Sequence, residues 1–88
     1  MGKHEYKYTL DFEALALKDL EALPKDIRRQ VGHGIDLLQR DWIGDIKKLE
    51  GYKNQYRLRV GKYRVLFELA GQDIIVYAVK DRKDAYGR

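Results

Sequence analysis

A tight-turn signal at Gly61-Lys62 constrains the fold most, because it fixes which residues of the two flanking runs face each other. With these two as loop residues, Val60 pairs with Tyr63, and the pairing continues back along both strands. One face of the predicted hairpin is then apolar and comprises Tyr56, Leu58, Val60, Tyr63, Val65 and Phe67. A shift by one residue would turn arginines into the core, so we expect this register.

The opposite face of the predicted hairpin carries three arginines. Arg59 lies directly across from Arg64, and Arg57 lies two residues along the same strand. Like charges directly opposite each other on a sheet are unfavourable, and Glu68 is one carboxylate about two pairs away. The arginines either splay into solvent as a solubilising face or bind an anion. The planar guanidinium fork suits phosphate oxygens, so we expect a phosphate site mounted on rigid strands.

The rest of the chain predicts two helices and further strands. Alternation of Tyr6 and Tyr8 with polar residues indicates a strand, and Asp11 is a suitable N-cap for the helix that follows. The predicted elements are a strand at Glu5–Leu10, a helix from Phe12 to Pro24, a helix at Lys25–Asp41, a turn at Asp45–Leu49, and strands at Gln55–Val60, Lys62–Ala70 and Asp73–Lys80. This order favours an α+β fold, β-α-α-β-β-β, with two N-terminal helices packed on a mostly antiparallel four-stranded sheet. We expect a single domain over residues 1–88.

Two glycines interrupt the clearest helical period in the chain. Apolar residues recur at spacings of three and four in the helix expected at Lys25–Asp41, which predicts one buried stripe. Gly32 and Gly34 lie inside this helix, where each glycine costs about 1 kcal/mol relative to alanine. Close approach of the helix to the sheet or to the first helix would explain them.

Composition excludes several kinds of site. The chain has no cysteine, which removes disulfides, thiolate metal sites and cysteine nucleophiles. His4 and His33 are too far apart in sequence for a helical metal-binding pair, and we expect neither in the functional site. No apolar run approaches the length of a membrane span, and no secretory signal is evident. We therefore expect a cytoplasmic protein without a metal, a cofactor or a membrane partner.

Positive charge is concentrated in the second half of the chain. The formal net charge is −2 over residues 1–46, with 7 Lys/Arg against 9 Asp/Glu, and +6 over residues 47–88, with 11 against 5. Such asymmetry is typical of a solvated basic face or of a surface that binds a polyanion. The lysines that we expect to contact such a polyanion are Lys47, Lys48, Lys53, Lys62 and Lys83.

The C-terminal segment is expected to join the arginine face. If the last strand follows the hairpin without interruption, Val79 lies beside Arg64, and the tail leaves the sheet near the arginines. Arg82 and Tyr86 then reach the same cleft. A tyrosine beside a basic site can stack on a base or donate a hydrogen bond to phosphate, although a surface tyrosine of a tail also packs there without such a role.

Three sequence fragments together resemble the RelE/ParE superfamily of bacterial toxins, over nearly the whole chain. They are Lys48-Leu49-Glu50-Gly51, the run of residues 56–66 with Gly-x-Tyr-Arg, and the terminal Arg-x-x-x-Tyr of residues 82–86. The resemblance implies the toxin of a type II toxin–antitoxin pair that cleaves messenger RNA in the ribosomal A site by attack of the ribose 2′-OH on the adjacent phosphate. The catalytic residues carried over by position are Arg57, Arg59, Arg64, Arg82 and Tyr86.

The resemblance also implies partners, namely an antitoxin protein, the ribosome and messenger RNA. The general base stays unassigned, because arginine is a poor proton acceptor and Glu50 and Glu68 are the nearest carboxylates to the arginines in the predicted hairpin. Two alternatives stay open. One is a ParE-like toxin that inhibits DNA gyrase by protein contact, and the other is a non-catalytic module that binds RNA or its antitoxin.

Overall fold

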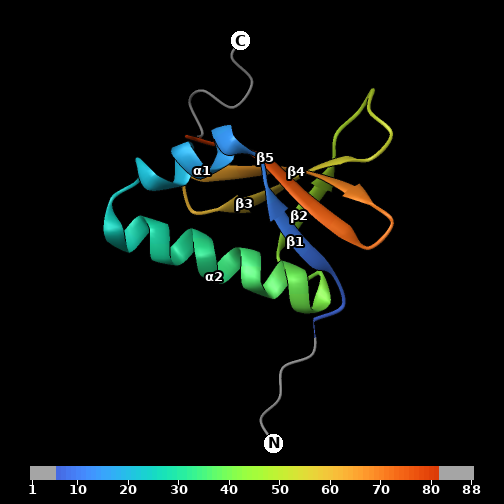
Figure 1. The fold of residues 1–88 in the computed structure, drawn as a ribbon, viewed down its shortest axis with the longest axis horizontal. Helices are drawn as coiled ribbons and strands as arrows, with labels where there is room; N and C mark the ends of the chain where they lie inside the picture. The colour runs from blue at the N-terminus through green and yellow to red at the C-terminus, as the bar shows by residue number, and fades with distance from the viewer. Residues whose placement is uncertain (1–5, 82–88) are drawn as a thin grey trace, which may run out of the picture.

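The computed structural model describes residues 6–81. These residues form two helices and one five-stranded sheet (Figure 1). The elements are β1 (Thr9–Phe12), α1 (Ala14–Glu21), α2 (Lys25–Asp41), β2 (Asp45–Lys48), β3 (Gln55–Val60), β4 (Tyr63–Ala70) and β5 (Asp73–Asp81). The predicted α+β class is confirmed, with one strand more than the four expected.

The sheet has the order β1-β5-β4-β3-β2. The last four strands of the chain are antiparallel neighbours, whereas β1 pairs with β5 in parallel. The first and last strands therefore lie side by side, although residues 13–72 separate them in the sequence. The prediction of a mostly antiparallel sheet is confirmed.

The additional strand is β2, so the prediction of a turn at Asp45–Leu49 is wrong. Asp45 pairs with Arg59 and Lys48 with Tyr56, so this segment forms the edge of the sheet next to β3. Only Ile46 of its four residues is partly buried. One apolar residue among charged ones gives no readable alternation, which is why the sequence pattern did not predict a strand.

The N-terminal elements are shifted from their predicted positions. β1 covers Thr9–Phe12 rather than Glu5–Leu10, and α1 begins at Ala14, after Glu13. Asp11 is therefore a strand residue, and its side chain accepts a hydrogen bond from the backbone of Phe12 instead of capping α1. Parallel pairing with β5 explains the shift, because it extends the strand through residues that locally favour a helix start.

The core lies between both helices and one face of the sheet. α2 covers the predicted range, and its residues Val31, Ile35 and Leu38 are buried against the sheet. Gly34 allows this approach, since a Cβ atom there would lie 2.7 Å from Val60 Cγ2, whereas a Cβ atom at Gly32 would meet nothing within 4 Å. The expected close approach therefore explains only the second of the two glycines.

An aromatic cluster closes the C-terminal end of α2. Trp42 ends the helix in the left-handed conformation and packs edge-on against Tyr56 and Phe67, with ring centroids 5.3 and 5.7 Å apart. The Tyr8 ring packs at a tilt against the same indole, with ring centroids 5.4 Å apart. Because Tyr56 and Phe67 are partners across β3 and β4, this cluster fixes which face of the hairpin turns inward.

The β3–β4 hairpin has the predicted register. Val60 pairs with Tyr63 and Arg59 with Arg64, around the turn at Gly61 and Lys62. The pairing of β4 with β5 is interrupted, however, because Leu66 pairs with Ala78 and Phe67 with Val76. Tyr77 is the extra residue of a β-bulge between them, and every later residue of β5 is displaced by one position.

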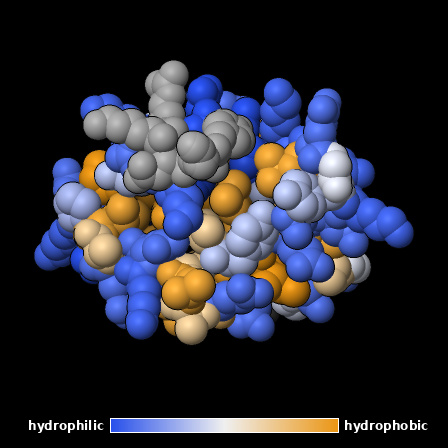
Figure 2. Space-filling view, turned by 90° about the horizontal axis from the view of Figure 1, so that it is seen from above, coloured by the Kyte–Doolittle hydropathy of each residue, from blue (hydrophilic) through white to orange (hydrophobic). Residues whose placement is uncertain are grey.

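The surface of the described residues is mixed in character. When the molecule is turned by 90° from the view of Figure 1 and seen from above, apolar side chains form separate patches among hydrophilic ones (Figure 2). Neither helix of the described part is long and apolar enough to cross a membrane. The concentration of charge that remains to be explained lies on the sheet face that the helices leave uncovered.

Candidate functional site

The sheet face turned away from both helices carries charged residues in register across four strands. Asp45 pairs with Arg59, Arg59 with Arg64, and Arg64 with Lys80, so β2, β3, β4 and β5 each contribute one residue to a single row. We call this the charged row. It contains three basic residues and one carboxylate, and strand pairing rather than loop conformation sets its spacing.

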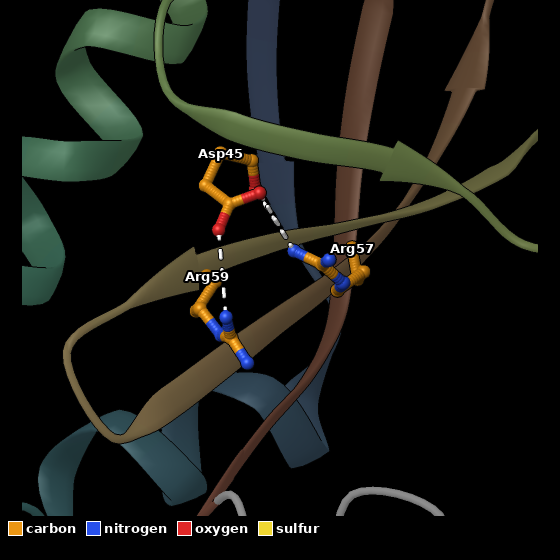
Figure 3. A network of polar contacts seen from close by, with 3 residues as sticks. All are labelled: Asp45, Arg57 and Arg59. Carbon is orange, nitrogen blue, oxygen red and sulfur yellow. Dashed lines mark hydrogen bonds and ion pairs between the residues drawn. The ribbon is translucent and has the colours of Figure 1, made fainter.

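Asp45 joins two of the predicted catalytic arginines (Figure 3). Its Oδ1 lies 3.3 Å from Arg57 Nη1, and its Oδ2 lies 3.8 Å from Arg59 Nη1. Arg57 Nη1 also donates to the backbone carbonyl oxygen of Asp45, at 3.1 Å. A carboxylate between two guanidiniums reduces their mutual repulsion and orients both, although the sequence had suggested only Glu50 and Glu68 as nearby carboxylates.

Arg57 and Arg64 are mostly buried although they lie on the uncovered face. Their exposed fractions are 9% and 8%, whereas the side chain of Arg59 is 38% exposed. The Nε atom of Arg57 is buried and has no hydrogen-bond partner among the described residues. A buried donor without an acceptor costs free energy, so an incoming anion that accepts from this guanidinium would stabilise the site.

Lys80 occupies the place beside Arg64 that was expected for Val79. That prediction is wrong because the bulge at Tyr77 shifts the register, so that Val79 pairs with Val65 and is buried in the core. Lys80 instead lies exposed at the end of the charged row. A bulge is not visible in the sequence pattern, and this residue was therefore missed.

The lysines predicted to contact RNA are exposed in the described part of the chain but do not share one face. Lys47 pairs with Arg57 and lies on the arginine face. Lys48 pairs with Tyr56, whose ring belongs to the opposite face. Lys53 lies in the loop between β2 and β3, and Lys62 lies in the turn between β3 and β4. The lysines therefore lie on β2 and in the two loops that flank β3, and of the two on β2 only Lys47 shares the face of the arginines.

Some predicted site residues lie outside the described residues. These are Arg82, Lys83 and Tyr86, and His4 lies outside them as well. His33 is exposed on α2, on the side of the sheet away from the arginines. Glu50 is exposed in the loop before β3. The described site thus rests on the three strand arginines, on Asp45 and on the residues in register with them.

A second polar group lies further along the same face. Gln55 pairs with Glu68 across β3 and β4, and the Tyr77 hydroxyl donates a hydrogen bond of 2.8 Å to Gln55 Oε1. Burial raises the pKa of Tyr77, with the charge of Glu68 among the smaller causes. The phenol is therefore protonated and able to donate at neutral pH.

The opposite side of the molecule offers a different surface. A hollow of about 260 Å³ lies between β1, α1 and α2, and its lining is mainly apolar, with Leu10, Leu20 and Ile35 among the residues. Within residues 6–81, no group of three or more His, Cys, Asp or Glu side chains is arranged to hold a metal ion. The arginine face is therefore the described surface best suited to a phosphate.

Comparison with protein families gives a match over most of the chain. Residues 10–86 match the family described as ParE toxin of type II toxin-antitoxin system, parDE. Among curated proteins, the chain is 40% identical to Toxin RelE3 of Methanocaldococcus jannaschii over 80 residues, which covers 85% of this chain and 91% of that protein. It is 33% identical over 86 residues to Putative toxin RelE1 of the same organism, covering 91% and 96% of the two chains.

Solved structures have the same fold. The toxin–antitoxin complex RelB-RelE from Methanococcus jannaschii contains a chain with a TM-score of 0.73 and 35% identity, which covers 88% of this chain and 95% of that chain. The archaeal RelE-RelB complex from Pyrococcus horikoshii OT3 gives a TM-score of 0.73 at 29% identity, covering 90% and 99%. The isolated E. coli RelE toxin gives 0.70 at 25% identity, covering 84% and 83%.

Proposed function

Because the chain belongs to the RelE/ParE family of toxins of type II toxin–antitoxin systems, we propose that it is an endoribonuclease that cleaves messenger RNA in the ribosomal A site and so inhibits translation. The observation that carries the proposal is the charged row, in which Arg59 and Arg64 lie directly opposite each other with Arg57 beside them. A protein that acts only by contact with another protein does not need this concentration of guanidiniums on rigid strands.

The arginines stabilise the transition state of phosphoryl transfer. The ribose 2′-oxygen forms a bond to phosphorus while the bond to the 5′-oxygen breaks, which leaves a 2′,3′-cyclic phosphate and a 5′-hydroxyl. Negative charge gathers on the phosphoryl oxygens, and each contact from a preorganised guanidinium stabilises it by about 3 kcal/mol. Arg57 has a buried Nε without an acceptor among the described residues, which supports its role in holding this charge.

Asp45 is the carboxylate best placed to accept the 2′-OH proton. It contacts both Arg57 and Arg59, so a phosphate held by these arginines brings its ribose close to Oδ1 or Oδ2. Glu68 is only a diagonal neighbour of Arg57 across β3 and β4, about 7–8 Å away, and contacts neither guanidinium, so Asp45 is the closer carboxylate. We assign Asp45 as the general base, in addition to its orienting contacts with the arginines.

The remaining predicted residues bind RNA or protonate the leaving 5′-oxygen. Lys47 lies on the arginine face, as does Lys80, which was not predicted. Lys53 and Lys62 flank this face on loops, and all four lysines neutralise neighbouring phosphates. Lys48 lies on the same edge strand. In the family assignment, Arg82 supplies or steers the proton for the leaving 5′-oxygen and Tyr86 orients the nucleotide; both lie outside the described residues.

We also propose that this protein is cytoplasmic and that an antitoxin holds it inactive. The same fold occurs in a RelB-RelE antitoxin-toxin complex, in an archaeal RelE-RelB complex and in the intact E. coli RelBE toxin-antitoxin complex, which supports a partner of that kind. An acidic antitoxin segment over the charged row would pair carboxylates with the arginines, or would block entry to the ribosome. Such a segment competes with RNA for the same guanidiniums.

The deciding experiment is induced expression in a bacterial host, with transcript 5′ ends mapped within minutes for the wild type and Arg64→Ala. We expect new ends inside translated reading frames for the wild type and none for the variant. Thermal unfolding of purified Arg64→Ala must show a cooperative transition, because its side chain is buried on the sheet face. Unchanged cutting in a folded variant would remove Arg64 from the site.

The family description itself favours one alternative, since the matching model is that of a ParE toxin. A ParE-like inhibitor of DNA gyrase would arrest growth with intact messages and altered DNA supercoiling. That result in the same cells would replace the ribonuclease proposal. Growth without arrest and without cutting would instead indicate a module that binds RNA or antitoxin without chemistry.

A further inference from the structure

We propose that Asp19 is a positioning residue that holds Lys80 in the charged row. The inference rests on the proposed function, in which Lys80 contacts a phosphate of RNA. Asp19 lies on α1, and its Oδ2 accepts a hydrogen bond of 2.9 Å from the backbone N–H of Val79, the residue before Lys80. The contact joins the first helix to the end of the last strand, across 60 positions of the sequence.

α1 takes the place of a neighbouring strand along this part of β5. β1 pairs with β5 only as far as Phe12 and Val76, and Glu13 N–H then donates to the Val76 carbonyl oxygen at 2.9 Å. Beyond Val76, no second strand of the described residues lies beside β5 on that edge. The helix that follows is anchored in the core by Ala16, which is fully buried. Asp19 therefore supplies an acceptor from a fixed element where a strand carbonyl is missing.

The direction of the Val79 N–H determines what the contact holds in place. In an antiparallel pair, residues that exchange hydrogen bonds with the partner strand alternate with residues that do not. Val79 N–H points away from β4 and toward Asp19, so the backbone of Lys80 faces its partner Arg64 on β4. The side chains alternate as well, since Val79 is buried in the core and Lys80 is exposed on the opposite face. Holding Val79 therefore sets where the Lys80 side chain emerges.

The end of β5 depends on a second attachment because its pairing with β4 is weakened in two ways. The bulge at Tyr77 interrupts the ladder, so residues 78–81 form a short paired segment of their own. Within this segment Arg64 and Lys80 are like charges directly opposite each other, which is an unfavourable pair. A hydrogen bond to the partly buried carboxylate of Asp19 fixes the segment at its other edge. Without it, we expect the segment to move and Lys80 to leave its place beside Arg64.

The charge and the hydrogen bond of Asp19 have opposite effects on RNA binding and can be separated. A negative charge repels a polyanion, whereas a correctly placed Lys80 attracts it. Asp19→Asn and Asp19→Leu remove the same charge and have similar side-chain volumes, but only asparagine keeps an acceptor oxygen for Val79 N–H. The difference between these two variants therefore reports the hydrogen bond alone.

The first measurement is hydrogen exchange of the Val79 amide, followed by NMR. We expect exchange to be at least about tenfold faster in Asp19→Leu than in the wild type, because the amide loses its acceptor, and close to the wild-type rate in Asp19→Asn. This measurement does not depend on any activity of the protein. Equal exchange rates in all three proteins would overturn the proposal.

The second measurement is binding of an RNA probe that cannot be cleaved. The probe is end-labelled 2′-O-methyl octauridine, which lacks the attacking hydroxyl, and the readout is fluorescence anisotropy. At about 0.1 M salt, Asp19→Leu should bind roughly three- to fivefold more weakly than the wild type, the effect of losing one phosphate contact. Asp19→Asn should bind as tightly as the wild type or more tightly. Unchanged or tighter binding by Asp19→Leu would overturn the proposal, because loss of the charge alone predicts that result.

A double-mutant cycle tests whether Asp19 acts through Lys80. If it does, Asp19→Leu should change the affinity by less than about 1.5-fold in a chain that already carries Lys80→Ala. Two substitutions with independent effects would instead multiply, so that the double variant would bind more weakly than either single variant by the full factor of the other. Independent effects, or no measurable binding of the probe by the wild type, would overturn the proposal.

Matched controls exclude a general loosening of the sheet. Thr9→Val removes a side-chain hydrogen bond to Asp73, at the other end of β5, and should keep the wild-type affinity for the probe. Asp19→Ala removes the same acceptor as Asp19→Leu with less bulk and should behave in the same way. Each variant must unfold in one cooperative thermal transition. Because the probe is not cleaved, an absence of messenger RNA cutting in cells would refute the ribonuclease and leave this test valid, whereas independent effects in the cycle would refute only the role of Asp19.

Discussion

The carboxylate of Asp45 lies 3.3 Å from the guanidinium of Arg57, and the two residues belong to neighbouring strands. The contact gives Asp45 two roles with opposite effects on RNA. As a negative charge it weakens binding, and as the proposed base it accelerates cleavage. We therefore predict that Asp45→Asn lowers kcat at least about 100-fold while KM stays the same or falls.

The measurement is steady-state cleavage of a reporter message on purified ribosomes, with Asp36→Asn as the control. Asp36 lies on α2, where it pairs with Arg40, and the control removes the same charge away from the arginines. A rise in KM with unchanged kcat for Asp45→Asn would show that this carboxylate only orients the arginines. Thermal unfolding should show a loss of about 1 kcal/mol or less, because the asparagine amide keeps an acceptor oxygen for Arg57.

Neutralising Lys80 should reduce the salt dependence of RNA binding. It ends the charged row beside Arg64 and is exposed, so Lys80→Ala leaves the core intact. Each lost phosphate contact lowers the slope of log K against log salt by about 0.7 for a single strand. The measurement is anisotropy with a non-cleavable oligonucleotide over a salt series. Lys25→Ala, at the start of α2, should leave the slope unchanged, and an equal change in both variants would argue against a localised site.

Alanine at the two helical glycines should change stability in opposite directions. Gly34→Ala places a Cβ atom 2.7 Å from Val60 Cγ2, and the stiff valine has little room to move, so we expect a loss of about 1–2 kcal/mol. Gly32→Ala meets nothing within 4 Å and should gain up to about 1 kcal/mol from helix propensity. Urea unfolding of both variants measures the difference. A stabilised Gly34→Ala would mean that α2 does not approach β3 as described.

The raised pKa of Tyr77 predicts a loss of stability at high pH. Burial keeps this phenol protonated in the folded state above 10.0, the ordinary pKa of tyrosine, whereas the unfolded chain releases the proton there. The contribution is therefore present below about pH 10 and is lost as the pH rises through the higher pKa of the folded state. Unfolding of the wild type between about pH 9 and pH 11 should fall more steeply than that of Tyr77→Phe. Parallel curves would contradict a raised pKa.

Much of the fold could be predicted because the hydrophobic pattern is strong where the core is formed. The hairpin register followed from one glycine turn and from alternation that left Arg59 opposite Arg64. α2 followed from its apolar spacing. β2 and the parallel β1 could not be predicted in this way, because their positions depend on pairing with strands distant in the sequence rather than on a local pattern.

The site was predicted in part for the same reason. Residues on one hairpin share a register, so the sequence alone could place Arg57, Arg59 and Arg64 together. Asp45 was missed because the local pattern at Asp45–Leu49 predicts a turn instead of a strand. Lys80 was missed because the bulge at Tyr77 displaces it by one residue. Both errors concern the pairing of strands within the folded sheet. Such pairing depends on how the whole sheet assembles and leaves no local pattern in the sequence.

The parallel pairing of the first and last strands has a consequence for synthesis of the chain. Thr9 on β1 and Asp73 on β5 are partners separated by 64 positions. At ordinary elongation rates the later strand emerges roughly 3 to 13 s after the earlier one. Until then β4 has no neighbour on that side, and Lys80 is not yet beside Arg64. The charged row is therefore incomplete until nearly all of the sheet has been translated, and the ribosome that synthesises the chain is not exposed to the complete row before then.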